Sequence, residues 1–355
     1  MIRPILFGLN IEAARHLAIL LLRLVGRLPF DVGRKMLRRV YRVEHPSLGR
    51  SVFGVRFANP VGLAAGFDVN GEVVNQLSDI GFGFVEVGAI SPEMQEGNPK
   101  PRVYRLPKDR AVVQRMGHPN RGLAFAIERL RRRDPNVVVG CNIAPNLTAE
   151  VGLWAREYLK CFRNLYQYVD YFTVNIGYNN LICDERTTAT MAISNLLTQL
   201  FDFRRGQSDY RPILIKVAPD LSDEMIDSIV EVLISTPLDG VVATSGTYSR
   251  KELETSQATA SRIGAGRLSG EPLRRRAVDV VRRIYDKSGG AYPIIGVGGI
   301  STAADVEEMM AAGASLVQIY SSFIYSGPRV VGDICRGLIE EDEEQVDSVA
   351  PLSEL

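Results

Sequence analysis

From about residue 51 to the C-terminal region, short apolar runs alternate with helical stretches, and this rhythm constrains the fold more than any other feature. The runs are rich in Val and Ile with little apolar–polar alternation, which is typical of parallel strands buried on both faces. Because helical stretches separate the runs, the pattern favours a (β/α)8 TIM barrel over an open doubly wound sheet. The eight predicted strands cover residues 61–65, 84–89, 137–143, 171–176, 213–218, 240–244, 293–298 and 315–320.

The first fifty residues differ from the rest, with ten Arg or Lys and three acids. They predict two short amphipathic, basic helices separated at Leu28-Pro29, because proline ends or kinks a helix. Neither is long enough to span a bilayer, which takes about 20 apolar residues. Two interpretations stay open: a helical cap on the main domain, or an interfacial anchor whose apolar side chains enter lipid while Arg and Lys meet anionic headgroups.

Three parts are therefore expected: the helical segment 1–50, a barrel over 51–340 without an internal composition shift, and a tail over 341–355. From Glu340 onward the chain has seven acids and no basic residue, which predicts a loosely ordered, solvated end. A net charge of +1 argues against a nucleic-acid partner held by phosphate neutralisation. Three histidines and four scattered cysteines predict neither a metal site nor a disulfide framework.

In a TIM barrel, chemistry sits on the loops after the C-terminal ends of the strands. Gly298-Gly299 and Tyr320-Ser321 follow the last two strands and offer glycine amides and hydroxyls to an anion, so a phosphorylated ligand is predicted. Lys216 ends a buried strand. Because buried lysines are rare unless paired, we expect Lys216 to meet electron-rich atoms of a ligand.

The fourth predicted strand continues into a loop with the sequence YFTVNIGYNN. It offers the amides of Asn175, Asn179 and Asn180 together with the phenol of Tyr178. Such a set suits a planar, polar ligand.

Eight sequence blocks follow one another along the chain: NPVGLAAGFDVNGE, GFGFVEVGAISPEMQEGNPKPRVYRL, QRMGHPNRG, IKVAPDLS, DGVVAT, LSGEPL, PIIGVGGI and GASLVQIYSSFIYSGP. Through these blocks the chain resembles the quinone-linked (class 2) dihydroorotate dehydrogenase family from about residue 4 to 335. The basic N-terminal helices resemble the extension that, in this family, sits on the membrane and admits quinone to the flavin. The resemblance thus implies a membrane-associated flavoenzyme and favours the anchor interpretation.

The resemblance also implies an FMN cofactor on top of the barrel. Its isoalloxazine would lie along the first strand end, its polar edge would meet amides and a lysine, and its phosphate would meet the glycine loops. A cation near the pyrimidine ring would stabilise negative charge on the reduced form. The implied FMN residues are Ala65 and Gly66 along the ring, Asn142, Asn175, Lys216 and Thr244 at the polar edge, and Gly270, Gly299, Tyr320 and Ser321 at the phosphate.

The substrate side departs from the family pattern. Tyr178 stands at the position of the family's serine base, and Val69 stands where a lysine is expected. A phenol can give or accept a proton beside the flavin, and its reference pKa near 10 makes it a better donor than serine. The remaining expected substrate contacts are Gln114, His118, Asn175, Asn180 and Ser245, with His118 also a candidate acid or base; Ala89, Gly177 and Gly246 are further departures.

These departures support a leading hypothesis and two alternatives. The leading one is an FMN-dependent oxidoreductase that exchanges electrons with quinone and acts on a small polar compound other than dihydroorotate, with Tyr178 as acid or base. The first alternative is a functional dihydroorotate dehydrogenase of pyrimidine biosynthesis, and the second is a non-catalytic flavin-binding paralogue. The expected location is the cytoplasmic side of the inner membrane, or the cytoplasm if the N-terminal helices only cap the barrel.

Overall fold

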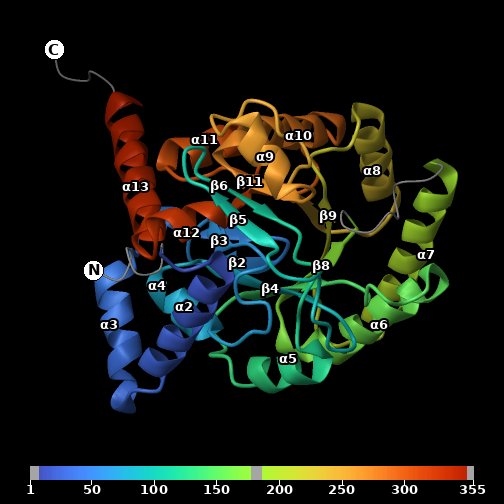
Figure 1. Cartoon of the computed structure of the whole chain (residues 1–355), viewed down its shortest axis with the longest axis horizontal. Coiled ribbons are helices and arrows are strands. Elements are labelled where there is room, and N and C mark those ends of the chain that lie inside the picture. Colours follow the sequence, from blue (N-terminus) through green and yellow to red (C-terminus); the bar gives the residue numbers. More distant parts are fainter. Residues whose placement is uncertain (1–7, 177–185, 350–355) are drawn as a thin grey trace.

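The computed structural model describes residues 8–176 and 186–349, and in this part of the chain a closed barrel of eight parallel strands forms the centre (Figure 1). The order around the barrel is β10-β12-β13-β3-β4-β7-β8-β9, and β9 pairs with β10 to close it. The predicted strands and the (β/α)8 fold are confirmed. The strands are β3 (Val61–Leu63), β4 (Phe84–Ile90), β7 (Val139–Ile143), β8 (Tyr171–Asn175), β9 (Ile213–Val217), β10 (Gly240–Ala243), β12 (Ile294–Val297) and β13 (Leu316–Ile319).

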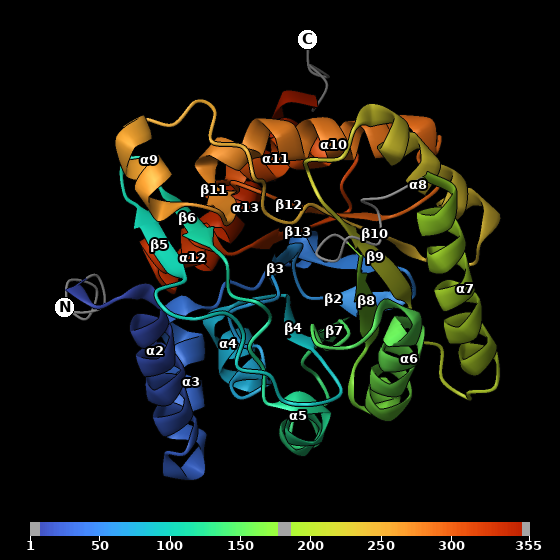
Figure 2. The ribbon, with the colours of Figure 1, turned by 45° about the vertical axis from the view of Figure 1, so that its right-hand side comes forward.

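Helices surround the barrel (Figures 1 and 2). They are α4 (Val74–Ile80), α5 (Gly122–Leu130), α6 (Trp154–Leu165), α7 (Arg186–Arg205), α8 (Asp223–Ser235), α10 (Arg274–Lys287), α11 (Ala303–Ala311) and α13 (Arg329–Val349), with the shorter α9 (Gln257–Ile263) and α12 (Ser321–Ser326) in connections. The helix α13 continues past residue 340 to Val349, so the boundary expected at 340 falls inside a helix. Residues 350–355 of the expected tail lie outside the described residues.

Aromatic side chains fill the barrel at the N-terminal ends of its strands. Phe84 and Tyr171 are fully buried there, and the hairpin of β1 (Arg50–Val52) and β2 (Val55–Phe57) covers them with Phe57, whose ring centroid lies 5.1 Å from that of Phe84. Gly140 makes room, because a Cβ at this position would lie 2.0 Å from the Tyr171 ring. With this end packed, the space for a ligand is at the opposite end.

A three-stranded antiparallel sheet, which the sequence did not predict, stands beside the C-terminal ends of the barrel strands (Figure 2). It contains β5 (Val103–Leu106) and β6 (Ala111–Gln114) from the connection after β4, and β11 (Arg267–Gly270) from the connection after β10. Arg267 of β11 stands opposite Gln114 of β6. The sheet thereby brings two distant loops to one side of the barrel opening.

The N-terminal helices α2 (Ile11–Gly26) and α3 (Val32–Tyr41) form a pair against the barrel, with a 3-10 turn at Pro29–Asp31 between them (Figure 2). The predicted helices and the predicted break at Pro29 are confirmed. Arg34 and Arg38 both bond to the buried Asp79 of α4, with Nε–carboxylate distances of 2.7 and 2.6 Å. No helix of the described residues is both long and apolar enough to cross a membrane.

Candidate active site

Four polar side chains predicted to meet the flavin's polar edge lie at the C-terminal ends of adjacent strands. Asn142 belongs to β7, Asn175 ends β8, Lys216 belongs to β9 and Thr244 follows β10. Asn175 Nδ2 donates to Asn142 Oδ1 at 3.2 Å, and Asn175 pairs with Lys216 in the strand register. The parallel barrel therefore brings these four residues together although they are far apart in the sequence.

A buried carboxylate of β4, which the sequence analysis missed, organises this group from inside the barrel. Glu86 is fully buried and accepts hydrogen bonds from Asn142 Nδ2 at 3.0 Å, Thr173 Oγ1 at 3.0 Å, Gln318 Nε2 at 2.8 Å and Tyr171 OH at 3.3 Å. Burial, and then the Glu86 charge, raise the pKa of Tyr171 well above its usual value. The signal in the sequence is an acid inside the apolar run FVEVGA, because a charge in a buried strand needs several partners.

Lys216 and Asn175 present complementary polar groups to the space above the barrel. Lys216 is 7% exposed, and burial lowers its pKa while the Glu86 charge acts in the opposite direction. Asn175 Oδ1 is buried and has no hydrogen-bond partner among the described residues. A buried cation and a buried acceptor without a partner are costly unless a ligand meets them.

The predicted phosphate-binding residues form another wall of the same space. Gly270 and Gly299 adopt φ values of 113° and 71°, in the left-handed region that favours glycine. A Cβ at Gly299 would lie 2.9 Å from the backbone nitrogen of Arg274. Ser321 Oγ lies 2.9 Å from Ser269 Oγ, so two hydroxyls line the cavity together with these glycines.

A cavity of about 900 Å³ connects these walls. Every residue that the resemblance assigned to FMN lines it, including Ala65 and Gly66 of the loop after β3 and Tyr320 after β13. The lining fits a planar group with a hydrogen-bonding edge and an anionic end, because Asn175 Oδ1 needs a donor and Gly270, Gly299 and Ser321 line the other end.

The expected substrate residues that the structure describes line the same cavity. Gln114, His118, Asn175 and Ser245 are all part of its wall. Gln114 Oε1 accepts a hydrogen bond from the Met116 backbone nitrogen at 2.9 Å, whereas the buried Ser245 Oγ has no partner within the described ranges. The expected contacts Tyr178 and Asn180 lie outside the described residues.

His118 has a local environment that restricts its chemistry. Its backbone is left-handed (φ 50°), and its carbonyl accepts from Gln95 Nε2 at 3.0 Å and Asn120 Nδ2 at 2.9 Å. Burial, and then the nearby Arg267 charge, lower the pKa of His118 to about 4. A neutral imidazole at pH 7 can accept a proton or donate a hydrogen bond, but it is not a supply of protons.

Two lining residues give the substrate side an unexpected character. Val69 is buried in the wall with its apolar side chain, where the resemblance led us to expect lysine. Arg267, which the sequence analysis missed, enters the wall from β11 and is only 7% exposed. Arg267 reaches the barrel opening because β11 pairs with β6, and the sequence did not predict that sheet.

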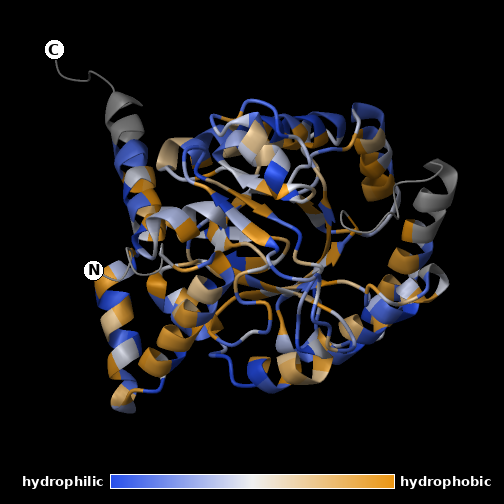
Figure 3. Ribbon diagram, viewed as in Figure 1, coloured by the Kyte–Doolittle hydropathy of each residue, from blue (hydrophilic) through white to orange (hydrophobic). Residues whose placement is uncertain are grey.

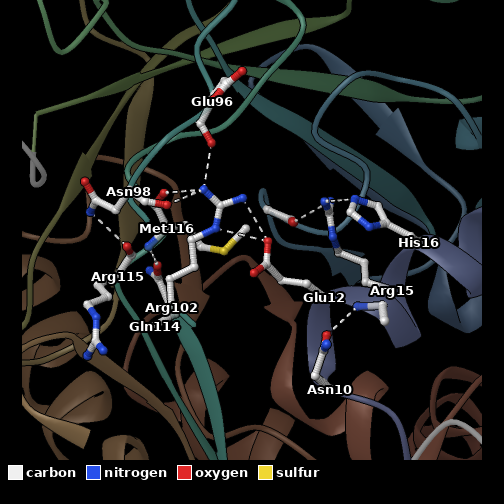
Figure 4. Close-up of polar contacts among 12 residues, drawn as sticks. Asn10, Glu12, Arg15, His16, Glu96, Asn98, Arg102, Gln114, Arg115 and Met116 are labelled. Carbon is white, nitrogen blue, oxygen red and sulfur yellow. Dashed lines mark hydrogen bonds and ion pairs between the residues drawn. The ribbon is translucent and has the colours of Figure 1, made fainter. Parts of the chain in front are cut away.

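Helix α2 closes one side of the cavity and is held there by charge contacts (Figure 4). Glu12 Oε1 accepts from Arg102 Nη2 at 2.8 Å and from Nε at 3.0 Å, and both side chains are about nine-tenths buried. Arg15 Nη1 donates to the Phe67 carbonyl at 2.8 Å, in the loop after β3. Between these contacts the helix lines the cavity with apolar residues: Ala14, Ala18, Leu21 and Leu22.

Comparison with known proteins agrees with this geometry. The profile of the dihydroorotate dehydrogenase family matches residues 47–341. A relative named dihydroorotate dehydrogenase (quinone) from Christiangramia forsetii is 39% identical, covering 96% of this chain and 98% of the relative. Another of the same name, from Nitrosospira multiformis, is also 39% identical, covering 99% and 98%. The crystal structure of DHODH from Eimeria tenella in complex with ferulenol superposes with a TM-score of 0.83 at 29% identity, covering 96% and 95%.

Proposed function

Because the chain belongs to the dihydroorotate dehydrogenase family of FMN-dependent oxidoreductases, we propose that it oxidises dihydroorotate and passes the electrons to a quinone. The observation that carries the proposal is one continuous cavity with polar residues at the barrel strand ends and apolar residues on α2. Such a cavity offers a polar end to a small heterocycle and an apolar end to a quinone.

The residues that would hold FMN are those of the two walls described above. Lys216 would place a cation at the polar edge, Asn175 Oδ1 would accept from a ring N–H, and Gly270 and Gly299 would expose backbone to the phosphate. When bound, FMN supplies the two-electron chemistry of the reaction. Glu86 would fix the orientation of Asn142, and through it that of Asn175.

The proposed acid or base is Tyr178, which lies three positions after Asn175, the last residue of β8, and outside the described residues. A phenol supplies the O–H that an acid or base needs near the reacting carbon, and its reference pKa lies near 10. The neutral His118 would form a hydrogen bond with the substrate from the cavity wall. A tyrosine acting as base predicts an oxidation rate that rises with pH.

A second candidate function retains the chemistry but changes the substrate. The buried Val69 and the partnerless Ser245 Oγ favour it, because a site built for one set of hydrogen bonds discriminates strongly against compounds that leave polar groups unpaired. The relatives lend this candidate no support, since those described above are named for dihydroorotate. It rests on the residues of the substrate wall alone.

One anaerobic experiment separates the candidates. The purified protein is mixed with dihydroorotate while the flavin absorbance is followed, and dithionite is added at the end. Bleaching by dihydroorotate, lost in Tyr178→Phe, supports the proposal. Bleaching by dithionite alone overturns it, and leaves a flavoprotein that either acts on another substrate or is not catalytic.

We extend the proposal to the membrane surface. Several large apolar side chains of α2, α3 and the segment between them remain exposed. The hydropathy colouring shows apolar and polar residues mixed along both helices (Figure 3). With the excess of Arg and Lys over this segment, such a surface suits peripheral binding to anionic lipid. The proposed location is the cytoplasmic face of the inner membrane. The exposed residues are Leu20, Leu24, Leu28, Phe30, Val32, Met36 and Val40.

A further inference from the structure

Glu12 of α2 carries a charge that the proposed reaction does not use. It lines the cavity, but its Oε1 atom accepts two hydrogen bonds from Arg102, whose side chain is 8% exposed. Within the described ranges, Glu12 is the one acid that pairs with Arg102, and Arg102 does not line the cavity. The pair therefore connects α2 to residues outside the cavity lining.

Arg102 directly precedes β5 and holds the chain at the open end of the hairpin of β5 and β6 (Figure 4). Its Nη1 donates to the carbonyls of Glu96 at 2.6 Å and Asn98 at 2.8 Å. Asn98 in turn donates from its backbone nitrogen to the Met116 carbonyl and from Nδ2 to the Arg115 carbonyl, both at 2.9 Å. Arg102 is thus linked through Asn98 to the segment that follows β6.

The segments before β5 and after β6 also touch directly. Gly97 has a φ of 76°, and a Cβ at this position would lie 2.3 Å from the Met116 carbonyl oxygen. Arg102 Nη1 lies 3.5 Å from the same oxygen, and the Arg115 backbone nitrogen donates to the Arg102 carbonyl at 2.9 Å. Because so little space separates the two segments, a displacement of Arg102 would be passed to Met116.

Met116 determines how Gln114, the last residue of β6, presents its side-chain amide to the cavity. The Met116 backbone nitrogen can only donate a hydrogen bond, and it donates to Gln114 Oε1. The backbone therefore occupies the amide oxygen of Gln114, and Nε2 is the donor that remains for a ligand in the cavity. A shift of Met116 would move or release this donor.

We propose that Glu12 is a positioning residue for the substrate, which acts through Arg102 and Met116 on the Gln114 amide. This inference rests on the proposed function, because it places the substrate against Gln114. In Glu12→Gln the guanidinium of Arg102 keeps its charge but loses its carboxylate, and a buried charge without a counter-ion draws in water or moves toward it. The carbonyls that Arg102 holds would then move with it. The helix that closes the apolar end of the cavity thus also sets the geometry of the polar end.

The test measures the binding of orotate, the product of the proposed reaction, to the flavin-loaded protein by the change in the flavin spectrum. We expect Glu12→Gln to bind orotate roughly tenfold more weakly than wild type, because a donor held in place contributes more than a mobile one. Arg102→Lys is a second variant, in case Glu12→Gln does not fold. It keeps a cation for Glu12 but lacks the guanidinium fork that reaches the carbonyls, so it should also weaken orotate binding while α2 stays attached.

A double variant tests the route through Gln114. If Glu12 acts through the Gln114 amide, Glu12→Gln should cause no further loss of orotate binding in a Gln114→Ala background. Additive losses in the double variant, or unchanged orotate binding in Glu12→Gln, overturn the inference.

Arg23→Gln is the matched control. Arg23 joins the same helix to Glu72 at 2.9 Å, and in the described part of the chain neither residue lines the cavity. This variant should bind orotate like wild type. Equal weakening in Arg23→Gln and Glu12→Gln overturns the inference, because any loosening of α2 would then be sufficient.

Hydrogen exchange at the Met116 amide separates a failure of the inference from a failure of the proposed function. Exchange should be faster in Glu12→Gln than in Arg23→Gln, and equal rates overturn the role of Glu12. If wild type binds no orotate while the Met116 amide responds as expected, the proposed dihydroorotate reaction is wrong and the positioning of Gln114 by Glu12 stands.

Discussion

At the scale of single residues, Lys216 shows how burial and function are connected. A lysine that is 7% exposed has lost most of its hydration, and its lowered pKa reflects that loss. The Glu86 charge offsets part of the penalty from within the barrel. A ligand with an electron-rich edge would offset the rest of this penalty. Removing the Lys216 charge should therefore weaken cofactor binding.

We therefore expect Lys216→Met to bind FMN roughly tenfold more weakly, equivalent to about 1.4 kcal/mol. The measurement is the flavin-to-protein ratio after gel filtration, together with the rise in melting temperature on adding FMN. Lys160→Met is the control, since Lys160 pairs with Glu93 on the surface. An unchanged flavin ratio in Lys216→Met would remove Lys216 from the cofactor site.

His118 makes a pH-dependent contribution to stability whose sign follows from its environment. Its pKa of about 4 in the folded protein lies below the ordinary 6.5, so the unfolded chain binds more protons between these values. Folded stability from this residue is complete above pH 6.5 and declines as the pH falls toward 4. His118→Phe should lose less stability than wild type between pH 7 and 4.5 in thermal unfolding. The exposed His45→Gln should follow wild type, and parallel curves for all three would contradict the assignment.

At the scale of elements, the sequence predicted what local periodicity encodes. The barrel strands are continuous apolar runs, and a proline marks the break between α2 and α3. Both signals lie within a few consecutive residues, so they can be recognised in the sequence. The sheet of β5, β6 and β11 was missed because each strand has four residues and β11 pairs with a partner about 150 positions away. Since Arg267 reaches the site only through this pairing, it was missed with the sheet. Glu86 was missed for a different reason, because its partners come from three other strands.

The attachment of α2 to the barrel depends on the buried pair of Glu12 and Arg102. Removing one partner of such a pair leaves the other charge uncompensated, which costs about 3–5 kcal/mol in buried cases. Arg102 retains the Glu96 and Asn98 carbonyls at 2.6 and 2.8 Å, so we expect the low end of that range for Glu12→Gln. Hydrogen exchange should then speed up along α2 while the barrel strands stay protected. Glu44→Gln is the control, because Glu44 forms an exposed pair with Arg42, and it should leave hydrogen exchange along α2 unchanged. Equal exchange rates in both variants would show that the Glu12–Arg102 pair does not hold α2.

At the scale of the whole molecule, the seven apolar residues of α2, α3 and the segment between them that the membrane proposal uses are 46% to 89% exposed. We expect Phe30→Ser combined with Met36→Ser to reduce co-sedimentation with vesicles containing anionic lipid at least several-fold. Met94→Ser is the control, because Met94 is 64% exposed in the connection after β4. Flavin content should stay the same in both proteins. If the double variant still pellets like wild type, the two helices are a cap and the membrane proposal is wrong.

The cavity has an apolar wall on α2 and a polar wall at the barrel strand ends, and this division bears on how the protein can be inhibited. An apolar compound bound against α2 need not resemble the substrate, and a small polar ligand at the strand ends need not displace it. Two such compounds should act independently, and joining them by a linker of suitable length should combine their affinities in one molecule. The division of the cavity into two unlike surfaces thus makes this protein a natural target for bifunctional ligands.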